Sequence, residues 1–134
     1  MAYSERLVIP ANTTEAAPAI IEIPILPITV KTVEITFPSG CVGLVGVWIE
    51  YQNRQIWPNN LEARFRGNDQ ALRFSPGIEL KEPPFSLALR GINEDDTFSH
   101  TIYFMIDVEF PGGFFESILS RLLPGSGPVA LSGR

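Results

Sequence analysis

The stretch from Phe98 to Phe110, FSHTIYFMIDVEF, constrains the fold of this chain more than any other. Apolar side chains occupy almost every second position, and polar or mixed side chains occupy the positions between them. Successive side chains of a β-strand point to opposite sides of the sheet, so this alternation predicts a long strand with one buried face. The predicted inward positions are His100, Ile102, Phe104, Ile106, Val108 and Phe110. A strand of this length must pair with earlier strands, which the preceding sequence has to supply.

Shorter alternating or apolar segments precede this stretch and are separated by turn residues. The predicted strands cover residues 7–9, 19–26, 28–37, 41–52, 54–57, 71–74 and 85–92. Val30 is out of phase with Val33, which predicts a β-bulge near Lys31. About eight strands with no helical periodicity before residue 110 predict an all-β, antiparallel sandwich. The long central connection favours a jelly-roll-like arrangement, and the Cys…Trp…Cys framework of immunoglobulin domains is missing.

Composition narrows the class of protein. The chain has 134 residues and is 45% hydrophobic, which suits one domain with a packed core. Its net charge is −5 and its basic residues are scattered, which argues against binding to a nucleic acid backbone. Cys41 is the single cysteine, so no disulfide forms within the chain. The apolar runs are too short to span a membrane.

The pattern changes after Phe110. Pro111, Gly112 and Gly113 predict a boundary between a sandwich domain, residues 1–110, and a tail, residues 111–134. Apolar residues of the tail recur at helical spacing, which predicts a short amphipathic helix. These residues are Phe114, Phe115, Ile118, Leu119, Leu122 and Leu123. Since Arg121 is the only cation on the polar side, the helix is expected to dock on a neighbouring protein subunit rather than on a membrane.

No motif predicts a catalytic centre, a metal site or a cofactor. His100 is the only histidine and has no nucleophile beside it in the sequence, so it is expected to be an ordinary strand residue. The acidic run from Asn93 to Asp96 could offer oxygen ligands to calcium, but its spacing matches no EF-hand loop. It is expected to be a solvated turn with hydrogen bonds from its own side chains.

Two groups of residues are candidates for contacts with other molecules. The segment 41–52 is apolar on both faces, and Val45, Val47, Ile49 and Tyr51 are expected to contact another subunit. Tyr103 and Met105, on the polar face of the last strand, form a second candidate contact. As an alternative, Trp57, Tyr51 and the acidic loop could bind carbohydrate. The opposite parity of Trp48 and Tyr51 weakens that alternative, because they cannot share a face.

Several runs resemble small β-sandwich proteins of unknown function encoded by tailed bacteriophages, often near capsid and tail genes. These runs are RLVIPANTTEAAP, VEITFPSGCVGLVGVWI, QIWPNN and GINEDDTFSHTI, within about residues 5 to 108. The resemblance implies a virion structural role, such as a capsid decoration or accessory protein, and brings no catalytic residues with it.

The expected protein is therefore a non-enzymatic component of a viral particle, assembled in the host cytoplasm. It is expected to form a homo-oligomer, with a trimer as one arrangement, and to dock on the major capsid protein or another virion protein. Neither nucleic acid nor membrane is an expected partner.

Overall fold

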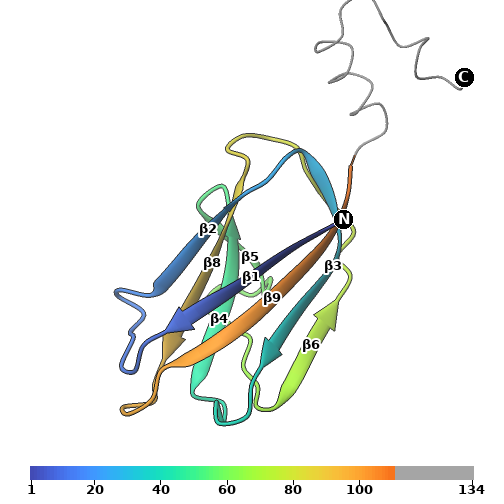
Figure 1. Cartoon of the computed structure of the whole chain (residues 1–134). Helices are drawn as coiled ribbons and strands as arrows, with labels where there is room; N and C mark the ends of the chain where they lie inside the picture. The colour runs from blue at the N-terminus through green and yellow to red at the C-terminus, as the bar shows by residue number, and fades with distance from the viewer. Residues whose placement is uncertain (111–134) are drawn as a thin grey trace, which may run out of the picture.

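The computed structural model of the chain describes residues 1–110, which form an all-β domain of two antiparallel sheets (Figure 1). This confirms the predicted sandwich class. The predicted helix at 114–123 and the rest of 111–134 lie outside the described residues, so the domain boundary and the tail stay predictions.

The first sheet is built around the last strand. In spatial order it contains β1 (Ala2–Ile9), β9 (His100–Glu109), β3 (Ile28–Phe37) and β6 (Gln70–Phe74). The short strand β7 (Ile78–Leu80) pairs with the other end of β3. β9 therefore lies inside this sheet and pairs on both of its edges, with the earlier strands β1 and β3.

The second sheet contains β2 (Ala19–Pro24), β8 (Ser86–Asn93), β4 (Val45–Tyr51) and β5 (Arg54–Trp57), in that order. The described residues thus contain nine strands, one more than the sequence predicted, because Ile78–Leu80 pairs with β3.

The strand pairs are nested along the chain. β4 pairs with β5, β3 with β6 and β7, β2 with β8, and β1 with β9. The same pairing would result from one long antiparallel hairpin that is rolled up. Two further pairs, β3 with β9 and β4 with β8, complete the two sheets.

The alternation of β9 sorts its side chains as predicted. Ile102, Phe104, Ile106 and Val108 are buried, and Tyr103, Met105, Asp107 and Glu109 are exposed. The predicted bulge is also confirmed, because the β3–β9 register shifts between Val30 and Thr32. Such a bulge places one extra residue on β3 and restores the inward phase of Val33.

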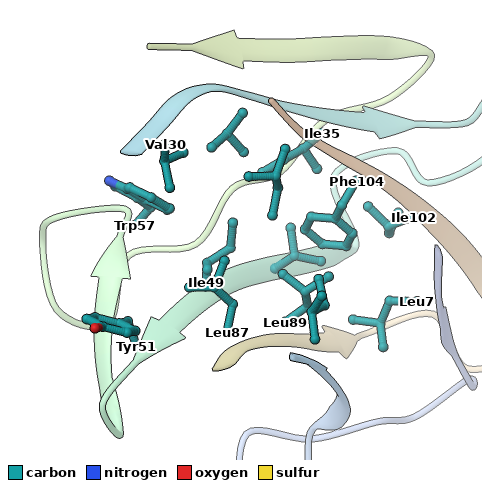
Figure 2. Packing of buried hydrophobic residues seen from close by; sticks show 14 of the residues in the cluster. Leu7, Val30, Ile35, Ile49, Tyr51, Trp57, Leu87, Leu89, Ile102 and Phe104 are labelled. Atoms are coloured by element: carbon teal, nitrogen blue, oxygen red, sulfur yellow. The ribbon is translucent and has the colours of Figure 1, made fainter. Parts of the chain in front are cut away.

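The core fills the space between the two sheets (Figure 2). Ile35 and Phe104 come from the first sheet, and Ile49, Leu87 and Leu89 come from the second. All five side chains are at most 2% exposed. Because each strand contributes every second residue to this layer, its other residues face away from the core.

Candidate docking surface

The acidic loop between β8 and β9 is tied down by a buried asparagine. Asn93 is 1% exposed, and its amide nitrogen donates to the backbone oxygens of Ile9, at 3.1 Å, and Phe98, at 2.9 Å. Its side-chain oxygen accepts from the backbone nitrogen of Asp95 at 2.9 Å. One side chain therefore joins the end of β1 to both ends of the β8–β9 loop.

Asp95 organises the rest of this loop. Its carboxylate accepts from the backbone nitrogens of Thr97, at 2.9 Å, and Phe98, at 3.2 Å. Its other oxygen lies 2.8 Å from Nε2 of His100. The Thr97 hydrogen bond first, then those from His100 and Phe98, lower the pKa of Asp95 below its ordinary value, because they favour the charged form. The His100 ring therefore helps to hold the β8–β9 loop in place through its contact with Asp95.

Residues 1–110 contain no group of three or more His, Cys, Asp or Glu side chains that could hold a metal ion. Cys41 is buried in the core, and its burial raises the pKa of the thiol. A raised thiol pKa reduces the fraction of thiolate at neutral pH, which is the reactive form.

The four predicted contact residues on β4 require a correction. Val45, Val47 and Ile49 are 0% exposed and belong to the domain's own core, so they have no surface to offer a second subunit. Tyr51 is 9% exposed, and its hydroxyl exchanges hydrogen bonds with the backbone of Glu82. These side chains face the first sheet, which already covers them.

The opposite side of β4 is covered by the chain itself. The guanidinium of Arg64 lies 3.7 Å from the ring centroid of Trp48, and Arg64 also forms an ion pair with Glu15 at 3.0 Å. Phe65, next in sequence, exchanges two backbone hydrogen bonds with Val47. Trp48 is left 5% exposed. The predicted strands leave residues 58–70 without a strand, and nothing in their pattern indicated that Arg64 would stack on Trp48.

The predicted carbohydrate platform is not at the surface. Trp57 is 6% exposed and packs edge-on against Phe74, with ring centroids 5.6 Å apart. Tyr51 belongs to the same core cluster and is 9% exposed. Sugar stacking needs an accessible ring face, which neither residue provides.

Tyr103 and Met105 lie where the sequence placed them, on the outer face of the first sheet. Tyr103 is 48% exposed and Met105 is 51% exposed. Strand register surrounds them with polar and charged neighbours from three other strands. We call this surface the Tyr103 face, and it consists of Ser4, Arg6, Glu34, Thr36, Arg73, Tyr103 and Met105.

Register explains how this face is assembled. Tyr103 lies between Arg6 on β1 and Thr36 on β3, and Met105 lies between Ser4 and Glu34. Directly opposite side chains on neighbouring strands are close enough to interact. Sequence reasoning found the two β9 residues by their parity, but it missed their neighbours, because only strand pairing brings these together.

The Tyr103 face combines residue types of both kinds. Tyrosine, methionine and arginine are enriched in protein interfaces, whereas glutamate and serine, present here as Glu34 and Ser4, are depleted. Arg73 and Glu34 form an exposed ion pair at 3.7 Å, and a shallow hollow of about 360 Å³ lies beside Arg6 and Tyr103. An exposed pair of this kind adds little stability, so both side chains can change partners at small cost.

The six tail residues that completed the predicted contact set lie outside the described residues. They are Phe114, Phe115, Ile118, Leu119, Leu122 and Leu123. Over residues 1–110 the structure contains no helix long and apolar enough to cross a membrane. Neither a scan against models of protein families nor a search of curated proteins finds a match to this chain.

Proposed function

We propose that this protein is a non-enzymatic structural protein of a viral particle, of the capsid decoration or accessory type. It acts by associating with copies of itself and by docking on a neighbouring virion subunit, such as the major capsid protein. The resemblance to small phage-encoded sandwich proteins suggests the virion, and the surface chemistry of the domain suggests protein contacts.

We also propose that the sandwich is a jelly roll. The nested pairing of β1 with β9, β2 with β8, β3 with β6 and β7, and β4 with β5 supports this topology. A jelly roll is a double-sheet arrangement of about eight strands that viral capsid domains share with lectins and cupins. Fold alone does not carry a function, so the proposal depends on the surface.

The Tyr103 face is the observation that carries the proposal. Tyr103 and Met105 stand about half exposed on β9, with Arg6 on the neighbouring strand β1 and Glu34 on the neighbouring strand β3, and Arg73 lies one strand further, opposite Glu34. The outer side of the other sheet differs, because Arg64 already covers Trp48 there. An aromatic and a thioether side chain on an open, regular sheet suit a flat protein partner.

The association is tested by measuring mass in solution. We expect the full chain to form a homo-oligomer by sedimentation velocity, and the double variant Tyr103→Ala, Met105→Ala to weaken that oligomer by about tenfold or more. Ile20→Ala is the matched control, because Ile20 is 44% exposed but lies on β2 in the other sheet. Equal loss from the control and the double variant would show that the Tyr103 face is not the contact.

The virion role is tested on the particles whose genome encodes this chain. We expect mass spectrometry of purified particles to detect the protein at a constant ratio to the major capsid protein. Its absence from purified particles, together with its presence in the lysate of the same cells, would refute the proposal.

A further inference from the structure

The strand β1 forms one edge of the first sheet, and its hydrogen-bonding phase can be worked out. The backbone nitrogen of Val108 donates to the oxygen of Met1 at 2.7 Å, so these two residues form a hydrogen-bonded pair. In an antiparallel ladder such pairs alternate with non-bonded pairs. Since Tyr3 pairs with Ile106 and Leu7 with Ile102, the odd residues of β1 bond to β9.

The even residues of β1 therefore turn their backbone groups away from the sheet. The N–H and C=O groups of Ala2, Ser4, Arg6 and Val8 have no hydrogen-bond partner within residues 1–110. The side chains of these four residues are exposed as well, including 53% of Val8. The result is an unbroken edge of eight backbone groups ready to pair with another strand.

The other three edges of the sandwich are interrupted. β2 ends at Pro24, and Pro27 follows it, which limits the donors on that edge. β5 has four residues and a register shift against β4. The edge beyond β3 is divided between β6 and β7. Short, bulged or proline-bearing edges and inward-pointing charges protect against pairing. Of these features β1 has only the charge of Glu5 on its inner face.

We propose that the β1 edge pairs with β1 of a second copy of this chain, antiparallel and about a two-fold axis. A two-fold contact needs an edge that complements itself. Only one register satisfies all the free groups at once. It places Ala2 opposite Val8 of the other copy and Ser4 opposite Arg6 of the other copy, and each of these pairs exchanges two hydrogen bonds.

The side chains that this register places opposite each other determine the expected affinity of the dimer. On the outer face the half-exposed Val8 meets the small Ala2 of the other copy, and Arg6 meets Ser4. On the inner face the axis passes between the two copies of Glu5. Like charges directly opposite each other on neighbouring strands are destabilising, so Glu5 keeps the pairing reversible.

This edge contact does not depend on the virion role or on the Tyr103 face. It would extend the sheet sideways, and the outer face would stay open for a different subunit. Two surfaces that point in different directions allow larger assemblies than one surface does.

The test uses paired variants of the full chain, measured by sedimentation velocity from about 10 µM to about 1 mM. Val8→Pro removes an outward N–H from each copy, whereas Val8→Thr keeps it in a side chain of the same shape, and Val8 lies outside the Tyr103 face. Proline is tolerated on edge strands where the N–H faces solvent, so the variant is expected to fold, and circular dichroism checks this. We expect dimerisation to be about tenfold or more weaker in Val8→Pro and unchanged in Val8→Thr.

A second variant tests the register. Glu5→Gln removes the like-charge contact at the axis and is expected to tighten the dimer roughly two- to fivefold. In the dimer, amide exchange at Ala2, Ser4, Arg6 and Val8 should slow, whereas the odd residues are already protected in the monomer.

Two results would overturn the proposal. A Val8→Pro variant that is folded and dimerises like the wild type would exclude the β1 edge as the contact. If both the wild type and Glu5→Gln were strict monomers, the β1 edge would not pair with a second copy, and an extended segment of another protein would be the remaining partner. The first result leaves the proposed function untouched, because self-association through the Tyr103 face would remain. The second would also refute self-association, but it would not bear on whether the chain is found in viral particles, which mass spectrometry tests separately.

Discussion

At Gly91 on β8 the two sheets lie so close together that adding a single methyl group tests their packing. Its Cα faces β1 across the core, and a Cβ added there would lie 2.3 Å from Cδ1 of Ile9. It would also lie 3.1 Å from Cγ1 of Ile9 and 3.1 Å from Cδ2 of Leu7. Since Ile9 is 0% exposed and Leu7 is 2% exposed, neither side chain can move out into solvent.

The expected cost of Gly91→Ala follows from two opposing effects. Overpacking of a well-filled core costs about 1–3 kcal/mol. The backbone of Gly91 is not in the left-handed region, so alanine also restricts the unfolded chain, which returns about 0.4–1 kcal/mol. We therefore expect a net loss of about 1–2 kcal/mol in the free energy of unfolding, which lowers Tm by about 5–10 °C in a domain of this size.

The assay is urea unfolding followed by tryptophan fluorescence, combined with a double-mutant cycle. Ile9→Val deletes the Cδ1 atom that the new methyl group would meet, and alone it costs about 1 kcal/mol. Because the two changes share one space, the double variant should cost less than the sum of the single variants by about 0.5–1 kcal/mol. The m-values should agree among all four proteins, so that the differences report stability.

One result would refute this account. If Gly91→Ala were as stable as the wild type and its effect simply added to that of Ile9→Val, β1 and β8 would not be in contact at this position. The inference that the two sheets pack closely at Gly91 would then be wrong.

Three further predictions concern the β8–β9 loop and the tail. Asn93→Ala should cost about 2–3 kcal/mol in urea unfolding, because it leaves buried backbone groups of Ile9, Phe98 and Asp95 unpaired; an unchanged midpoint would contradict this. The pKa of Asp95 is lowered from an ordinary 3.8, so its charged form adds stability above that pH, and the stability is lost as pH falls through the lowered folded value. The difference in unfolding free energy between wild type and Asp95→Asn should therefore be constant near neutral pH and shrink in acid, and a difference that persists in strong acid would count against the role of the charge. Deletion of residues 111–134 should leave the circular dichroism spectrum of the sandwich intact but weaken assembly, whereas an unfolded product would place the tail in the core.

Local periodicity was sufficient for eight of the nine strands in residues 1–110 and for the exposure of Tyr103 and Met105. The parity of residues 98–110 alone separated the buried Ile102 and Phe104 from the exposed Tyr103 and Met105. The phase change between Val30 and Val33 located the bulge of β3. Such features follow from the two-residue repeat of a strand, which depends only on neighbours in the chain.

The same periodicity failed for β4, where it recognised two apolar faces but not what covers them. The inner face, with Val47 and Ile49, meets the first sheet, and the outer face meets Arg64. The covering residue comes from a segment without any strand pattern, so its position depends on backbone bonds between Phe65 and Val47. An apolar face needs a cover, but its composition does not say whether the cover is the same chain or another.

The sequence by itself determined the all-β class, the long final strand and the outward direction of Tyr103 and Met105. The tertiary structure decided which strands are neighbours, and therefore that Arg6 and Thr36 flank Tyr103, that Ser4 and Glu34 flank Met105, and that β1 is left as an open edge. The physical reason is that side-chain direction is a property of the local backbone, whereas strand pairing is decided by the burial of whole faces between segments far apart in the chain.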